Sequence, residues 1–462
     1  MNEAYEDDGW APTPLAVEAA TALFVLTALV AGGSSSSPLM VGVVRLAAIP
    51  VLAMALWRAS TWPPARGWIW PMLLLVAAAA LTLAQLVPLP PQVWSALPGR
   101  ELVAEGYATA GLALPVLPIS LAPQATLSAL LGLLPPAAAF AAVLGLDEAA
   151  RRRLMLLVAA VALTSIGLGM LQMAGGERSG LRLYDVTNLD SAVGFFANRN
   201  HQASFLVAAI PLAAALAASL GRRRSRTAFM SILAVSVVVV LIVGVAVTRS
   251  RAGVALLVPA FAGALAITLR GRPRRKGLQG LWPVLAMGGA IVLGGALVAV
   301  FSFTPLAQRF AAPEETRPRI AAQVLDAGFD YAPFGSGVGS FAPVYRIHEP
   351  AQRLLPAFVN HAHNDYAEIW LEASWPGLAL VAGFLAWWAG AVFAVARDWR
   401  AQGRGLQLAG ASVTGIYLLH SLADYPLRTP AASVLFALAC GLMIAPAWVL
   451  EHEPPPGEDE EL

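Results

Sequence analysis

The feature that most limits the fold of this chain is a series of long apolar runs, many of them about 20 residues in length. A helix of about 20 residues crosses the roughly 30 Å of hydrocarbon in a bilayer. Hydrophobic residues make up 58% of the sequence and charged residues only 13%, which excludes an ordinary soluble domain. The sequence therefore predicts an all-α polytopic membrane protein.

About twelve such runs are separated by polar or Gly- and Pro-rich breaks. The predicted transmembrane helices are 14–33, 39–57, 69–88, 125–146, 153–174, 201–220, 228–247, 252–269, 282–303, 374–396, 408–426 and 430–450. The first ten residues are acidic and polar, so we expect no cleavable signal peptide and a first run that stays as a span.

This pattern divides the chain into four parts. We expect nine helices with short loops over 1–303, a large loop containing short helices over 304–373, three more helices over 374–450, and a solvated acidic tail over 451–462.

Basic clusters predict the orientation. They fall on one side of the alternating helices, at 151–153, 222–226, 270–276 and 397–400. By the positive-inside rule that side is cytoplasmic, and both termini then lie in the cytoplasm. The large loop, together with shorter segments at 89–124 and 175–200, is expected on the opposite face.

Two patterns stand out in the first part of the large loop. Arg317 to Phe329 has a helix-like arrangement of Ile320, Val324 and Leu325. A glycine-rich breaker, 333–340, follows it. Its alternate glycines could expose N–H groups to a phosphate, or the segment could be a plain turn.

The end of this loop holds the densest polar run, His361-Ala-His-Asn-Asp-Tyr-Ala-Glu. In a strand His361 and His363 would share a face, whereas in a helix they would diverge by about 200°. A helix would have its N-cap near Asn360 or His361. One side of such a helix would carry His363, Tyr366, Ala367 and Trp370.

The histidines allow two kinds of chemistry. His361, His363 and Asp365 resemble part of a metal site, for which His348 is a further candidate ligand. A general base is the more natural interpretation, because imidazole titrates near neutral pH and takes a proton from a hydroxyl.

Arginines also gather where the topology predicts the outer face: Arg199, Arg249, Arg251, Arg317 and Arg319. They could simply anchor helix ends, but the positive-inside bias argues against that function on this side. An arginine within or at the end of a membrane-spanning helix normally faces a bundle interior or an aqueous cavity.

Farther along, His420 and Asp424 are four residues apart at the end of a predicted span. On one helix face they could hydrogen-bond, either as a structural pair or in support of the site.

Arginines and histidine together favour a pyrophosphate-bearing substrate and a reaction that needs a base, as with a lipid-linked sugar. The sequence has no P-loop and no dinucleotide fingerprint, so we do not expect ATP-driven transport, and nothing indicates a nucleic-acid partner.

Several motifs resemble the O-antigen ligase and polymerase superfamily of bacterial envelope glycosyltransferases. They include Thr-Arg-Ser-Arg-Ala-Gly from 248, Arg-Ile-Ala-Ala-Gln-Val-Leu from 319, Pro-Phe-Gly-Ser-Gly-Val-Gly-Ser-Phe from 333, the histidine run, and His-Ser-Leu-Ala-Asp-Tyr-Pro-Leu from 420. Leu-Val-Pro-Leu-Pro-Pro-Gln-Val-Trp from 86 and Leu-Pro-Gly-Arg from 97 are similar to the first outer loop of that superfamily.

The resemblance implies a multi-pass inner-membrane enzyme with its site facing the periplasm. It implies an undecaprenyl-pyrophosphate-linked glycan as donor, lipid A-core or a lipid-linked glycan as acceptor, and no metal or other cofactor. By position in the motifs, Arg251 and Arg319 are the catalytic arginines that bind pyrophosphate, and His363 is the general base, with His361 as the other candidate. Supporting substrate contacts are expected from Arg199, Arg249, Arg317, Tyr345, Asn364 and Asp365.

Two questions stay open at this stage. Ligase and polymerase motifs overlap, so the acceptor is not determined. A transporter or flippase of lipid-linked oligosaccharides is the alternative class, and its cations should line a central cavity.

Overall fold

The structure is a computed structural model that describes residues 13–61, 67–220, 227–270, 288–289, 316–349, 359–398 and 404–444. The long helices are α1 Pro14–Ala31, α2 Pro38–Thr61, α3 Ile69–Ala84, α6 Pro123–Leu131, α7 Leu134–Leu144, α8 Glu148–Ala174, α9 Arg199–Leu220, α10 Thr227–Val247, α11 Arg251–Arg270, α16 Asp365–Arg397, α17 Arg404–His420 and α18 Pro430–Leu442. The described part of the chain is mostly helical, as predicted.

Seven helical segments in the described part of the chain are long and apolar enough to cross a membrane. The count of twelve spans remains a prediction. The ninth predicted run, 282–303, lies outside the described residues apart from 288 and 289. The acidic tail and much of the basic clusters after 221 and after 270 also lie outside them.

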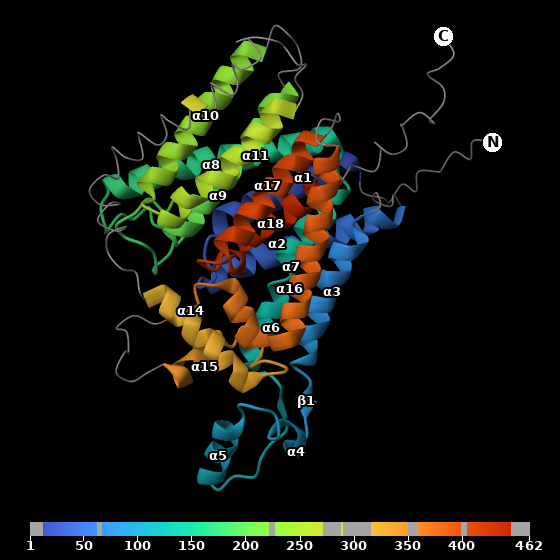
Figure 1. Cartoon of the computed structure of the whole chain (residues 1–462), viewed down its shortest axis with the longest axis vertical. Helices are drawn as coiled ribbons and strands as arrows, with labels where there is room; N and C mark the ends of the chain where they lie inside the picture. Colours follow the sequence, from blue (N-terminus) through green and yellow to red (C-terminus); the bar gives the residue numbers. More distant parts are fainter. Residues whose placement is uncertain are drawn as a thin grey trace, which may run out of the picture.

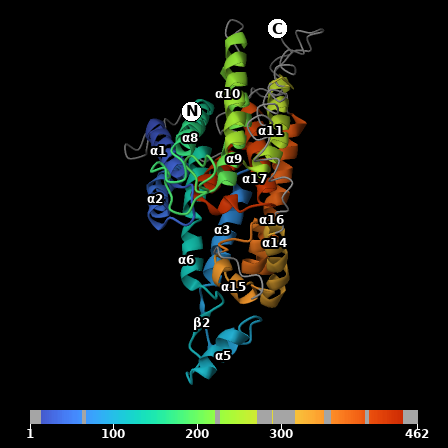
Figure 2. The ribbon, with the colours of Figure 1, turned by 90° about the vertical axis from the view of Figure 1, so that its left-hand side faces the viewer.

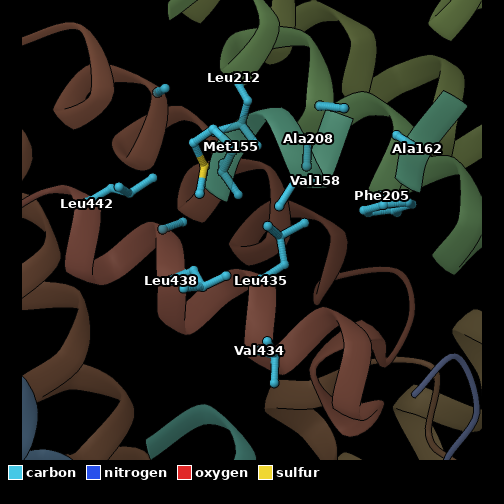
Figure 3. Packing of buried hydrophobic residues seen from close by; sticks show 14 of the residues in the cluster. Met155, Val158, Ala162, Phe205, Ala208, Leu212, Val434, Leu435, Leu438 and Leu442 are labelled. Carbon is cyan, nitrogen blue, oxygen red and sulfur yellow. The ribbon is translucent and has the colours of Figure 1, made fainter. Parts of the chain in front are cut away.

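Helix α9 is at the centre of the bundle, where it packs against α8, α10, α11 and α17 (Figure 1). It is buried along most of its length, because small and apolar residues occur on all of its sides. Side chains of α8, α9 and α18 meet in one dense apolar region (Figure 3).

The fourth predicted span, 125–146, is two helices in the structure. Helix α6 ends at Leu131 and α7 begins at Leu134. Pro135 and Pro136 follow directly and have no N–H groups, so they fit only the first turn of a helix. The break therefore falls where the prolines require a new helix.

A small second core lies at one end of the bundle, which we call the loop unit. It consists of α14 Thr316–Ala327, the 3₁₀ turn Gly328–Tyr331, α15 Phe341–His348 and the first turns of α16 (Figures 1 and 2). The predicted helix after Arg317 is confirmed, with Ile320 and Val324 buried. Leu325, the third apolar residue of that pattern, is 47% exposed.

Helix α16 joins this unit to the bundle. It starts at Asp365 and is interrupted at Ser374, whose φ of 45° and ψ of −134° are not helical. The part of α16 after Ser374 corresponds to the tenth predicted span. The part before Ser374 belongs to the loop unit.

The segment between α3 and α6 extends beyond the loop unit (Figure 1). Strand β1, Pro88–Leu89, pairs antiparallel with β2, Leu117–Pro118. Two short helices, α4 Pro91–Trp94 and α5 Glu101–Thr109, lie between these strands in the sequence. Arg100 ties this segment to the glycine-rich turn by donating to the carbonyl oxygens of Ile119 and Gly335.

Candidate active site

Asp424 is the centre of the candidate site and is fully buried between the bundle and the loop unit. Its Oδ1 accepts hydrogen bonds from His363 Nδ1 and from the main-chain N–H of Tyr425, each at 3.1 Å. Its Oδ2 accepts from Asn200 Nδ2 at 2.6 Å and from Arg317 Nη1 at 3.3 Å. Burial opposes ionisation, but the hydrogen bond from His363 and the charge of Arg317 outweigh it and hold the pKa of Asp424 well below its usual range.

The ionised carboxylate determines the tautomer of His363. A carboxylate can only accept, so the proton of a neutral His363 is on Nδ1 and its Nε2 carries a free lone pair. The side chain is 17% exposed, so it is reachable from outside while its partner is not. This is the arrangement that a general base requires.

The main chain around His363 differs from the predicted helix. His363 has a left-handed φ of 52°, and the next residue, Asn364, is the N-cap of α16. The Asn364 side chain accepts from the N–H groups of Tyr366 and Ala367, each at 3.0 Å. The cap predicted at Asn360 or His361 was therefore wrong, and His363 lies outside the helix rather than along one side of it.

His361 has a different carboxylate partner. Its Nδ1 lies 2.8 Å from Oε1 of the buried Glu368. The ring of Tyr425 lies close to both histidines, with centroids 4.0 Å from His361 and 5.2 Å from His363. The site thus holds two histidine–carboxylate pairs beside one tyrosine.

Arg428 forms ion pairs with three acidic side chains of α16. It belongs to the 3₁₀ turn Pro426–Arg428 and lies 3.5 Å from Asp365, 3.2 Å from Glu368 and 2.9 Å from Glu372. Their spacing puts the three acids on one buried helix face. Asp365, a predicted substrate contact, also accepts a hydrogen bond from the Ser421 hydroxyl at 2.7 Å.

The side chains considered for a metal site have separate partners. His361 pairs with Glu368, His363 with Asp424, and His348 Nε2 lies 3.0 Å from the Tyr331 hydroxyl in the loop unit. Within the described ranges, no group of three or more His, Cys, Asp or Glu side chains is placed to hold a metal ion.

The turn Thr248–Arg251 is packed against the start of α9. Ser250 accepts from the N–H of Gly253 at 3.0 Å and donates to Asn200 Oδ1 at 2.8 Å. A Cβ on Gly253 would lie 2.5 Å from Cβ of Ala203, so only glycine permits this approach. Arg249 has a φ of 55° and Arg251 is the first residue of α11, and both are half-buried.

The other predicted site residues are spread along neighbouring elements. Arg199 begins α9 and lies 3.5 Å from Asp190. On α14, Arg317 reaches Asp424 while the Arg319 side chain is exposed, since residues two apart on a helix point in different directions. The Tyr345 hydroxyl donates to Gln323 at 2.8 Å within the loop unit.

The glycine-rich turn is structural. Its N–H groups donate to protein acceptors: Gly335 to Tyr331 O, Ser336 to Leu371 O, Gly337 to Glu372 O and Val338 to Gln85 Oε1. Gly335, Gly337 and Gly339 all have positive φ. These N–H groups are committed within the protein, so the phosphate interpretation was wrong and the turn interpretation is confirmed.

The predicted helical pairing of His420 with Asp424 was also wrong. Helix α17 ends at His420, and Asp424 lies in the turn that follows. The main-chain N–H of Asp424 donates to the carbonyl oxygen of His420 at 3.0 Å. His420 and His201 are both buried, with ring centroids 6.1 Å apart. Among the described residues their ring nitrogens have no hydrogen-bond partner.

Sequence reasoning missed Asn200 and Ser250 and gave Asp424 too small a role. Ser250 stands between Arg249 and Arg251 in the Thr-Arg-Ser-Arg-Ala-Gly motif, and Asn200 directly follows Arg199, which was itself a candidate. Their short polar side chains next to apolar helices were the available signal.

One family model, described as O-antigen ligase, matches residues 236–382. This match confirms the resemblance to the O-antigen ligase and polymerase superfamily. No curated protein matches the chain. At the level of the family, the match implies a multi-pass protein of the bacterial inner membrane that transfers glycans from lipid-linked substrates. Asn200 and Asp424 lie outside the matched segment.

Proposed function

Starting from the match to the O-antigen ligase family, we propose that this protein is a glycosyltransferase of the periplasmic face of the inner membrane. It moves a glycan from an undecaprenyl-pyrophosphate donor to a hydroxyl group, either on lipid A-core or on another lipid-linked glycan. The observation that carries the proposal is the hydrogen bond between His363 Nδ1 and the buried Asp424.

The reaction follows from this pair. The acceptor hydroxyl attacks the anomeric carbon of the donor glycan, and its proton passes to His363 Nε2. The bond between the anomeric carbon and the pyrophosphate oxygen breaks, and undecaprenyl pyrophosphate leaves with the electron pair. Asp424 stabilises the imidazolium that forms, because its negative charge lies 3.1 Å from Nδ1.

Arginines meet the charge that develops on the leaving group. Arg251 and Arg319 are proposed to bind the pyrophosphate, with Arg199 and Arg249 as supporting cations. Guanidinium groups bind phosphate oxygens through two parallel hydrogen bonds, so no metal ion or other cofactor is required. Arg317 acts from the Asp424 side, since it contacts that carboxylate.

The remaining candidates have supporting roles. His361 is the second candidate base, because Glu368 orients it as Asp424 orients His363. We prefer His363 because Asp424 is connected through Asn200 and Ser250 to the arginine-bearing turn. Asn364, Asp365 and Tyr345 are proposed to shape the acceptor side by holding α16 and the loop unit in place.

The deciding experiment is to delete the gene and examine the cell-surface glycan. Loss of a ligase leaves lipid A-core without glycan, and long lipid-linked chains accumulate. Loss of a polymerase leaves single repeat units. A transporter, the alternative class, leaves donor on the cytoplasmic face. If purified protein then transfers no glycan to either acceptor, the proposed function is wrong.

A further inference from the structure

A continuous chain of hydrogen bonds runs from the arginine-bearing turn to the candidate base. Ser250 Oγ donates to Asn200 Oδ1 at 2.8 Å, and Asn200 Nδ2 donates to Asp424 Oδ2 at 2.6 Å. Asp424 Oδ1 in turn accepts from His363 Nδ1 at 3.1 Å. Ser250, Asn200 and Asp424 are all at least 95% buried.

The direction of each bond is determined. Asp424 can only accept, so the amide of Asn200 must point its NH₂ group toward the carboxylate and its oxygen away from it. That oxygen requires a donor, and the Ser250 hydroxyl supplies one. The hydroxyl oxygen is left to accept from the Gly253 N–H at 3.0 Å. Each member therefore fixes the orientation of the next.

The chain begins at the place where the donor is proposed to bind. Ser250 lies between Arg249 and Arg251, and through Gly253 it caps the helix that Arg251 starts. A movement of this turn when pyrophosphate binds would change the Ser250–Asn200 bond. The opposite end of the chain holds the tautomer of His363.

We propose that Asn200 and Ser250 are positioning residues that couple the donor-binding turn to the base His363. The inference rests on the proposed function for its chemistry. Asn200 holds Asp424 Oδ2 so that Oδ1 stays aligned with His363, and Ser250 holds Asn200. Neither residue is required to touch the substrate.

The test compares Ser250→Ala, Asn200→Ala and the double variant, using purified full-length protein and lipid-linked donor extracted from the deletion strain. A general base contributes about 10²–10⁴-fold to rate, so we expect each single change to lower kcat at least about tenfold. The donor KM should change less than kcat does, because neither residue is proposed to touch the donor. The double variant should be no slower than the slower single variant, since one chain is broken only once.

Two controls separate positioning from a general loss of structure. Ser250→Thr keeps the hydroxyl and should retain most of the activity. Ser204→Ala removes a buried hydroxyl on the same α9 helix that donates to the carbonyl of His201 at 3.0 Å, and it should leave kcat unchanged. Single-variant losses that multiply in the double variant, or a raised donor KM with unchanged kcat, would overturn the inference.

A second readout does not depend on turnover. Diethyl pyrocarbonate acylates unprotonated imidazole nitrogens, and mass spectrometry gives the ratio of modification at His363 to that at His361. We expect Asn200→Ala to change this ratio and Ser204→Ala to preserve it. An unchanged ratio in Asn200→Ala overturns the coupling even if wild-type protein transfers no glycan, an outcome that would separately reject the proposed function.

Discussion

Replacing Asp424 with asparagine is the most informative change at the centre of the site. The side chain keeps its size, but its four hydrogen-bond donors now meet one amide oxygen and one NH₂ group. The NH₂ group replaces one of the two carboxylate oxygens, so a hydrogen-bond acceptor becomes a donor at that position. If the NH₂ group faces His363, the ring must present an unprotonated Nδ1 and keep its proton on Nε2, where the base needs a lone pair.

The expected loss follows from the contribution of a general base. That contribution is about 10²–10⁴-fold, and the same substitution in hydrolases with an Asp–His pair costs about 10⁴-fold. At about 1.4 kcal/mol for each factor of ten, Asp424→Asn should raise the barrier by about 3–6 kcal/mol. The assay is steady-state transfer from lipid-linked donor by purified protein. The donor KM should change little.

Asp330→Asn is the matched control. Asp330 is 62% exposed and lies 3.8 Å from Nδ1 of His348, so it too is a carboxylate beside a histidine, but it lies away from the site. It should leave kcat unchanged. A kcat for Asp424→Asn within about threefold of wild type would refute the reasoning, because it would leave none of the general-base contribution dependent on this carboxylate.

The same variant carries a pH signature in stability. The folded-state pKa of Asp424 lies below its unfolded value, so the ionised group stabilises the fold above the unfolded pKa of about 3.9. That stabilisation is lost as pH falls through the folded-state pKa. Thermal unfolding of Asp424→Asn in detergent should therefore depend less on pH in the acidic range than unfolding of the wild type.

Three further predictions concern the arginine-bearing turn and the proposed absence of a metal. Arg251→Lys keeps the charge but loses the paired guanidinium donors. Loss of one hydrogen bond to a charged group, about 1.5–3 kcal/mol, should lower kcat/KM by about ten- to a hundredfold. The control Arg153→Lys should leave kcat/KM unchanged. Unchanged turnover would make Arg251 only an anchor. Gly253→Ala places a methyl group 2.5 Å from Ala203 Cβ, so overpacking of about 1–3 kcal/mol should lower Tm, whereas Gly167→Ala has open space and should not. EDTA should leave the transfer rate unchanged, and activity lost to EDTA and restored by zinc would contradict the metal-free proposal.

Hydropathy was a good guide to where helices form, because membrane-length apolar runs have few other solutions. It was a poor guide to where they end. The run 408–426 continues past His420 without a strongly polar residue before Asp424. Asp424 was therefore placed on a helix, although α17 ends four residues earlier. The turn that follows aims Asp424 at His363, and no periodicity in the sequence encodes that direction.

The candidate site was partly predictable for a related reason. Histidine and arginine are conspicuous in an apolar chain, so His361, His363, Arg251 and Arg317 could be singled out. Asn200 lies 224 residues from Asp424 in the sequence, and its role depends on the packing of α9 against α11 and α17. Contacts over such separations follow from tertiary structure and leave no local pattern.

The glycine-rich turn shows the opposite case, in which a local pattern suggested too much. Alternating glycines fit both an anion-binding loop and a tight structural turn. The kink at Ser374 ends the first part of α16, and the carbonyl groups of Leu371 and Glu372 accept from Ser336 and Gly337. The use of these N–H groups was decided by a helix break more than 30 residues away.

The most direct test of the central claim is the transfer rate of His363→Ala, measured beside His361→Ala in the complemented deletion strain and with purified protein. We predict that His363→Ala reaches wild-type levels in the membrane but transfers no detectable glycan, while His361→Ala retains measurable transfer. Normal surface glycan with His363→Ala would contradict the assignment of His363 as the base.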